Sequence, residues 1–201
     1  MAETKIPYDQ RLARACISPF AGTALHPNVV TGISLALGIA SGWSFAAGGP
    51  VMQHIAALLF MLAVFVDHMD GELARMTGKV SRAGYYLDYL VGSLNYTILF
   101  SAIGAGIYQW SGSEDALWIG LAAGLSNPII VALRLMMERR FGSEAVEHPS
   151  GGGFELEDFI YLIGPVTWLG GLEYFFWFYA TGTLGYLLWS VLTFLRKSSN
   201  A

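Results

Sequence analysis

The chain has 201 residues, of which 54% are hydrophobic and 13% are charged, and its formal net charge is −4 at pH 7. Its mean hydropathy of +0.49 excludes a water-soluble domain of ordinary composition. We therefore expect an integral membrane protein that is surrounded by a lipid bilayer and has no nucleic-acid partner. The only cysteine is Cys16, which excludes an intrachain disulfide bond and a cluster of thiolate metal ligands.

The predicted fold is an all-α membrane bundle of six transmembrane helices in a single domain, residues 1–201. Residues 1–25 are mixed and amphipathic and lack a cleavable signal sequence, so they predict an interfacial helix and its lead-in. Residues 26–197 contain the bundle, because each apolar run there approaches the roughly 20 residues that a span needs. The expected spans are 28–47, 51–75, 83–110, 117–137, 154–169 and 172–195.

The positive charges indicate how these spans are oriented. All 11 Lys and Arg residues fall before the first span, between the second and third, around the end of the fourth, or after the sixth. Positively charged residues near span ends remain on the cytoplasmic side of a membrane. We therefore expect both termini, and any site at that end of the bundle, to face the cytoplasm from the inner membrane.

Two carboxylates lie at the predicted cytoplasmic end of the second span. Asp67 and Asp70 are three residues apart, so on a helix they share one face with Gly71 and Ala74. Residues with almost no side chain leave space beside the two carboxylates. Because ionisable groups at membrane depth are costly, such a pair indicates a functional site.

The third span carries a matching stripe of residues. Asp88 lies one turn beyond Gly84, and the same stripe continues through Gly92 to Asn95. A hairpin of the second and third spans would bring Asp88 next to the two aspartates of the second span. Converging carboxylates suit a hard divalent cation such as Mg²⁺, Mn²⁺ or Ca²⁺. The alternative is that these aspartates are solvated at the interface or paired with nearby basic residues.

This stretch resembles the signature of the CDP-alcohol phosphotransferases, D-x2-D-G-x2-A-R-x8-G-x3-D-x3-D, and all of its positions but the last are matched. The matched residues are Asp67, Asp70, Gly71, Ala74, Arg75, Gly84 and Asp88. The sequence HPNVVTG at 26–32 is similar to the Pro-Asn-x-x-Thr element that opens the first span in these enzymes. The six-span layout after an interfacial helix also matches.

The resemblance implies a phospholipid-biosynthetic transferase, in which an acceptor hydroxyl attacks the phosphate of a CDP-alcohol and CMP is released. It implies that the three aspartates hold two divalent cations, Mg²⁺ or Mn²⁺, that bridge the pyrophosphate. It also implies a homodimer. The residues implied to border the nucleotide are Asn28, Thr31, Gly71, Ala74, Arg75 and Gly84. For Asn28 a role as a helix cap is the alternative.

Gly92 stands where the family signature has its last aspartate, the residue commonly assigned as the base that activates the acceptor. Loss of a positioned base typically costs about 10²- to 10⁴-fold in rate. The residues considered as replacements are His68, Glu72, Glu155, Glu157 and Asp158. A metal-bound acceptor or the acceptor's own phosphate could also take the proton.

Three interpretations of Gly92 remain open. The preferred one is an active transferase with another proton acceptor. In the second, Gly92 and Asn95 line space for a bulkier acceptor, although glycine also serves helix packing. In the third, the protein is a catalytically impaired relative that binds a CDP-lipid and metal as a partner or sensor.

The donor that we expect is CDP-diacylglycerol, by analogy with compact six-span bacterial enzymes, or another CDP-alcohol. The acceptor is expected to be a polar alcohol or an alcohol phosphate. Arg134, at the cytoplasmic end of the fourth span, could bind an acceptor phosphate through its guanidinium group. Its alternative role is to anchor the span at anionic lipid headgroups.

Overall fold

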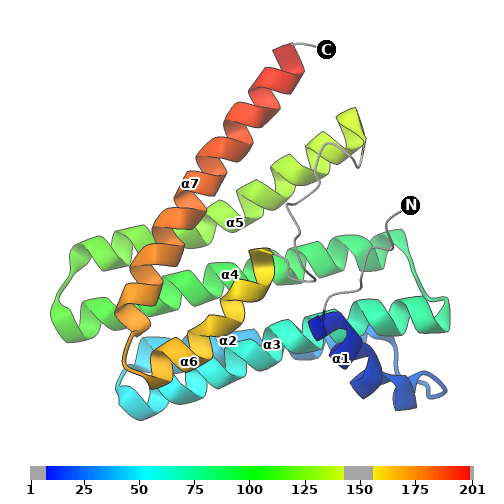
Figure 1. The fold of residues 1–201 in the computed structure, drawn as a ribbon, viewed down its shortest axis with the longest axis horizontal. Helices are drawn as coiled ribbons and strands as arrows, with labels where there is room; N and C mark the ends of the chain where they lie inside the picture. The colour runs from blue at the N-terminus through cyan, green and yellow to red at the C-terminus, as the bar shows by residue number, and fades with distance from the viewer. Residues whose placement is uncertain (1–7, 143–155, 200–201) are drawn as a thin grey trace.

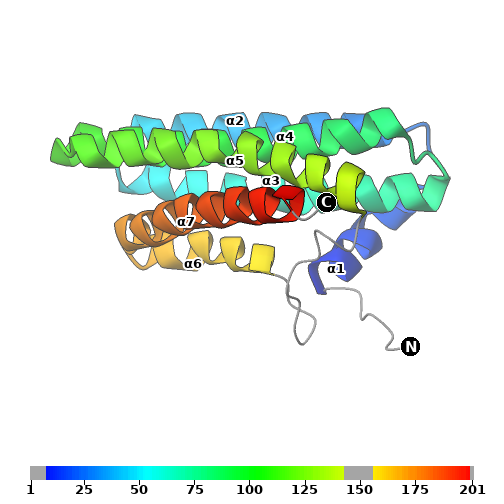
Figure 2. The same ribbon diagram turned by 90° about the horizontal axis from the view of Figure 1, so that it is seen from above.

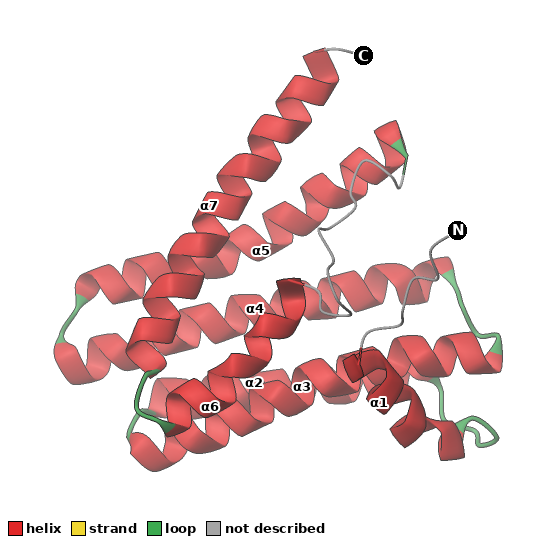
Figure 3. Cartoon of the chain, in the orientation of Figure 1, coloured by secondary structure: helices red, strands yellow, loops and turns green. Residues whose placement is uncertain are grey.

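The protein is described by a computed structural model that covers residues 8–142 and 156–199. Within these two ranges all regular secondary structure is helical (Figure 3). The elements are α1 (Tyr8–Ile17), η1 (Ser18–Phe20), α2 (Pro27–Ala47), α3 (Pro50–Thr77), α4 (Arg82–Ser111), α5 (Glu114–Phe141), η3 (Leu156–Leu162), α6 (Ile163–Trp168) and α7 (Leu172–Ser199). The helices α2, α3, α4, α5 and α7 are long and apolar enough to cross a membrane. The all-α membrane class and the short N-terminal helix are thereby confirmed.

The helix ends that flank the signature follow from local sequence. Pro27 occupies the first turn of α2, and the His26 Nδ1 atom accepts a hydrogen bond from the backbone N–H of Asn28. The Ser81 hydroxyl oxygen caps α4 by accepting from the Gly84 backbone N–H at 3.0 Å. Gly78 ends α3 at a φ of +65°, a left-handed conformation that glycine adopts without strain. The turn between α3 and α4 is therefore short.

The expected span at 154–169 is not found as one long helix. The described part of this region is a 3₁₀ segment, η3, followed by the six-residue helix α6. Pro165 lacks a backbone N–H, and its ring would clash with the carbonyl group four residues earlier in a continuous α-helix. The apolar stretch Phe159–Trp168 is consequently shorter than the five long helices. Six spans remain an expectation, whereas five candidate spans are found.

The long helices form a bundle in which α2, α3 and α4 lie side by side, and α1 packs against the end of α3 (Figure 1). Seen from above, α6 and α7 lie on the side of α3 that faces away from α2 and α4 (Figure 2). The hydrophobic core is centred on buried phenylalanines such as Phe45, Phe60 and Phe100. The C-terminal halves of α5 and α7 diverge from the rest of the bundle (Figure 1).

Glycines let α4 approach α5 and α2 closely. A Cβ atom at Gly120 of α5 would lie 2.6 Å from the Phe100 carbonyl oxygen and 3.0 Å from the Gly104 Cα atom of α4. One turn later, the Thr97 hydroxyl donates to the Gly124 carbonyl oxygen at 2.9 Å. On α2, a Cβ atom at Gly38 would collide with the Asn95 side chain. The small-residue stretches 38–42 and 120–124 are therefore packing surfaces, as expected for membrane helices.

Candidate metal centre

The three aspartates of the signature converge at one end of the bundle. Asp67 and Asp70 come from the last turns of α3, and Asp88 comes from the second turn of α4, across the short turn between these helices. One carboxylate oxygen of each residue lies within 4.8 Å of the others. The convergence expected from a helix hairpin is therefore found. Carboxylates this close repel one another unless a cation or protons compensate their charge.

Asp70 provides the most enclosed carboxylate of the cluster. Its side chain is only 4% exposed, and its Oδ2 atom is buried without a hydrogen-bond partner. The Thr31 hydroxyl group of α2 lies beside the same carboxylate. A buried carboxylate oxygen left without a donor is costly, and ligation of a metal ion would satisfy it. The chemistry of the three residues thus fits a hard divalent cation.

Asp67 is held by a chain of hydrogen bonds that joins three helices. The Asn95 Nδ2 atom of α4 donates to the Ser34 hydroxyl oxygen of α2 at 3.0 Å. The Ser34 hydroxyl donates in turn to Asp67 Oδ1 at 3.2 Å. Ser34 and Asn95 are both buried, at 0% and 3% exposure. This arrangement fixes the orientation of the Asp67 carboxylate.

The sequence reasoning missed Ser34. Ser34 follows Thr31 by three residues and precedes Gly38 by four, so it shares the face of α2 that meets the other two helices. That spacing could have indicated from the sequence that Ser34 faces the site. Asn95, predicted to line an acceptor space, lies between α2 and α4 with its side chain against Gly38.

Gly92 faces the cluster instead of a neighbouring helix. A Cβ atom built at Gly92 meets a single atom within contact range, Asp67 Oδ2 at 4.0 Å. Gly92 is therefore not a close-packing glycine like Gly38 or Gly120. A small side chain at position 92 would fit, and it would point towards the Asp67 carboxylate.

The residues expected near the nucleotide lie around the same end of the bundle. A Cβ atom at Gly84 would lie 3.7 Å from the Asn28 Oδ1 atom, which places Asn28 beside the start of α4. The Arg75 guanidinium group lies over Gly71, and its Nη2 atom pairs with Glu72 Oε1 at 2.7 Å. Ala74 is half-buried on α3. These residues thus lie where they could border a nucleotide held at the carboxylates.

The residues considered as a replacement base are not part of the carboxylate cluster in the described chain. His68 and Glu72 lie on α3 outside the group of three aspartates. Glu72 is 4% exposed, and its Oε1 atom is engaged by Arg75. The remaining candidates, Glu155 and the side chains of Glu157 and Asp158, lie outside the part of the chain that the structure describes.

Arg134 lies beside Tyr89 of α4. Its half-buried guanidinium group sits 5.8 Å from the centroid of the Tyr89 ring, and Tyr89 directly follows Asp88 on α4. The exposed Arg139 contacts Tyr86 instead, whereas Arg140 contacts the Phe141 ring and donates to the Ser198 hydroxyl oxygen at 3.4 Å. Of these arginines, Arg134 is thus the one held against the neighbour of a cluster aspartate.

The comparison with known sequences agrees with this site. The sequence model of the CDP-alcohol phosphatidyltransferase family matches residues 24–195, which is most of the chain. The chain belongs to this family. Among its relatives, the archaetidylinositol phosphate synthase of Pyrococcus horikoshii is 32% identical over 91 residues. That match covers 45% of this chain and 47% of the relative, so it spans about half the length of each.

A solved structure extends the likeness to the whole fold of this family member. The crystal structure of Mycobacterium tuberculosis phosphatidylinositol phosphate synthase with CDP-DAG bound has a TM-score of 0.67 to this chain. The likeness covers 93% of both chains at 19% sequence identity. At that identity the comparison establishes the shared fold, and the site rests on the family match and the carboxylate geometry.

Proposed function

We propose that the protein transfers a phospho-alcohol group from a CDP-alcohol to an acceptor hydroxyl. In this reaction the acceptor oxygen forms a bond to the phosphorus that carries the alcohol, the bond from that phosphorus to CMP breaks, and the acceptor loses its proton. The observation that carries the proposal is the cluster of Asp67, Asp70 and Asp88 in a member of the CDP-alcohol phosphatidyltransferase family. CDP-diacylglycerol is the proposed donor, because a structural neighbour was solved with CDP-DAG bound.

The three aspartates are the proposed ligands of Mg²⁺ or Mn²⁺, with two ions expected at the site. Bound divalent ions would neutralise charge on the phosphoryl oxygens. Within the chain, Asp70 supplies a buried oxygen with no other donor, and Ser34 orients Asp67. Asn28, Thr31, Gly71, Ala74, Arg75 and Gly84 are proposed to border the nucleotide, and Arg134 to bind a phosphate on the acceptor.

Replacement of Ser34 by alanine should weaken divalent-metal binding. The change removes the hydrogen bond to Asp67 Oδ1 and leaves the Asn95 amide without its acceptor. Loss of a partner that orients a metal ligand typically costs 10- to 100-fold in metal affinity, so we expect roughly tenfold weaker Mn²⁺ binding by titration calorimetry. Ser44→Ala is the matched control, because the Ser44 hydroxyl donates to the Ala40 carbonyl oxygen of its own helix. Equal affinities in the two variants would refute the orienting role of Ser34.

Gly92 is proposed to leave space for the acceptor next to Asp67. The proton of the acceptor hydroxyl is then taken by a group other than the residue at position 92, with the acceptor's own phosphate as one candidate. Since a Cβ atom fits at this position and alanine favours a helix more than glycine does, the Gly92→Ala variant should melt at an equal or higher temperature than the original chain. We expect the KM for the acceptor to rise at least about fivefold, the effect of roughly 1 kcal/mol of lost contact, while the KM for the donor is unchanged. An unchanged acceptor KM would contradict this use of the space.

The proposed topology has six spans, with η3 and α6 contributing a short fifth one. Basic residues gather at the end of the bundle that carries the aspartates. Arg82 begins α4, Arg139 lies in the last turn of α5, and Arg140 of α5 donates a hydrogen bond to Ser198 of α7. This distribution supports a site and two termini on the cytoplasmic side of the inner membrane. A homodimer, implied by the family resemblance, remains a prediction.

The proposal is tested by CMP release from the purified protein in lipid, with Mg²⁺ or Mn²⁺, CDP-diacylglycerol and a panel of polyols and polyol phosphates. Acceptor-dependent CMP would support the transferase and identify its acceptor class. Because Gly92 replaces the usual base of the family, a second candidate function is binding of a CDP-lipid and metal without transfer. Metal-dependent binding of CDP-diacylglycerol without CMP release from any acceptor would favour that candidate and contradict the transferase.

A further inference from the structure

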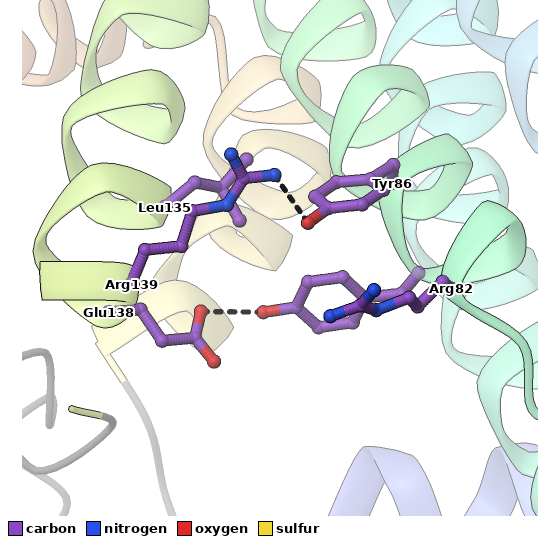
Figure 4. Close-up of a pocket in the computed structure, with 6 residues that line it drawn as sticks. Arg82, Tyr86, Leu135, Glu138 and Arg139 are labelled. Carbon is purple, nitrogen blue, oxygen red and sulfur yellow. Dashed lines mark hydrogen bonds between the residues drawn. The ribbon is translucent and has the colours of Figure 1, made fainter.

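A pocket lies between the start of α4 and the end of α5. Its volume is about 270 Å³, several times the roughly 30 Å³ that one water molecule occupies in the liquid. The lining residues are Arg82, Tyr85, Tyr86, Leu135, Glu138 and Arg139 (Figure 4). None of the three cluster aspartates lines this pocket, so the pocket is distinct from the proposed metal centre.

Hydrogen bonds order the walls of this pocket. The Arg139 Nη2 atom donates to the Tyr86 hydroxyl oxygen at 2.6 Å, and its guanidinium carbon lies 5.4 Å from the Tyr86 ring centroid. The Tyr85 hydroxyl donates to Glu138 Oε2 at 2.7 Å (Figure 4). The single carboxylate of the pocket is thus engaged by a neutral tyrosine and not by an arginine.

The charge balance of the pocket favours an anion. Among the described residues, neither Arg82 nor Arg139 forms an ion pair, and the formal charges of two arginines and one glutamate sum to +1. A guanidinium group has five N–H donors in a planar fork, and one of those of Arg139 is used by Tyr86. The remaining donors suit a phosphate oxygen pair.

The position of the pocket along the helices favours a lipid. It lies at the terminal turns of two candidate spans, where phospholipid headgroups and tyrosine side chains meet. Leu90 and Leu94 follow Tyr86 at intervals of four residues on α4, and both are exposed, at 53% and 36%. An apolar strip therefore leads from the pocket towards the centre of the bilayer, as acyl chains would require.

We propose that this pocket binds the phosphate group of a membrane phospholipid, with Arg82 and Arg139 as its ligands and the acyl chains along Leu90 and Leu94. A phosphodiester carries one negative charge, which matches the net charge of the pocket. The inference is independent of the proposed transfer reaction, because none of these residues belongs to the carboxylate cluster.

The test is native mass spectrometry of the full chain in neutral detergent, titrated with phosphatidylglycerol. Each arginine contributes a charged hydrogen bond, so Arg82→Gln and Arg139→Gln should each weaken retention of one lipid by roughly tenfold. Tyr86→Phe, which removes the hydrogen-bond partner of Arg139 and no charge, should weaken retention about threefold, because Arg139 is then held less firmly at the pocket. Arg140→Gln is the charge-matched control on the same helix end, and Asp70→Asn should retain the lipid.

Two results would overturn the proposal. Equal weakening by Arg140→Gln and Arg139→Gln would mean that the arginines attract anionic lipid without a defined site. Displacement of the lipid by millimolar inorganic phosphate would mean that the pocket takes free phosphate instead of a lipid headgroup. Melting temperatures of the variants equal to that of the original chain confirm that the comparison is made between folded proteins.

Discussion

Asp70→Asn is expected to slow CMP release about 10³-fold and to weaken Mn²⁺ binding. The substitution keeps the shape of the side chain and removes the negative charge at the most enclosed oxygen of the carboxylate cluster. An amide is a poorer ligand than a carboxylate for a hard divalent cation. Removal of one group that stabilises a developing charge costs about 10²- to 10³-fold in kcat, and we expect a loss at the upper end of that range. The measurement is the initial rate of CMP release at saturating donor, acceptor and Mn²⁺.

The control for this prediction is Asp115→Asn. Asp115 is an exposed carboxylate in the first turn of α5, at the other end of the helix from the pocket arginines. The Asp115→Asn substitution changes the net charge of the protein by the same amount as Asp70→Asn. It should leave both the rate of CMP release and the Mn²⁺ affinity unaltered. If Asp70→Asn behaved like Asp115→Asn in both measurements, the carboxylate cluster would not be the metal centre.

Gly120→Ala is expected to destabilise the protein more than any exposed substitution. The new Cβ atom would lie 2.6 Å from the Phe100 carbonyl oxygen and 3.0 Å from the Gly104 Cα atom. Both are backbone atoms, so α4 and α5 would have to move apart. Overpacking of this kind costs about 1–3 kcal/mol. For a chain of this size that corresponds to a melting temperature lower by roughly 2–12 °C, which thermal unfolding in detergent would measure.

Gly182→Ala on α7 is the matched control, because a Cβ atom there meets no atom within 4 Å. Alanine is a better helix former than glycine by about 0.5–1 kcal/mol, so this variant should melt at an equal or higher temperature. A Gly120→Ala variant as stable as Gly182→Ala would show that the contact between α4 and α5 is not tight.

Features encoded within a single helix could be predicted from the sequence. The ends of α2, α3 and α4 follow from Pro27, Gly78 and Ser81, whose effects act over one turn. The shared face of Asp67 and Asp70 follows from their spacing alone. Their meeting with the carboxylate of α4 needs only one more assumption, a short hairpin between adjacent helices.

Features that depend on how distant helices meet could not be predicted in the same way. The hydrogen bond from Ser34 to Asp67 joins residues 33 positions apart, and it forms because α2 packs against α3 at these two residues. Gly92 and Gly120 are both glycines in long helices, yet one faces a carboxylate and the other a helix backbone. The form of the region predicted as the fifth span could not be predicted either, because its described part is a 3₁₀ segment followed by a six-residue helix that contains Pro165.

The most direct test of the account is to follow both products of the transfer together. The purified protein is incubated in lipid with CDP-diacylglycerol, Mn²⁺ and the acceptor that gives the fastest CMP release, and CMP and the phosphatidyl-acceptor product are quantified by mass spectrometry. The account predicts equal amounts of the two products, with both formed about 10³-fold more slowly by Asp70→Asn. CMP formed without the lipid product, or at the same rate in Asp70→Asn, would contradict a transfer reaction at the carboxylate cluster.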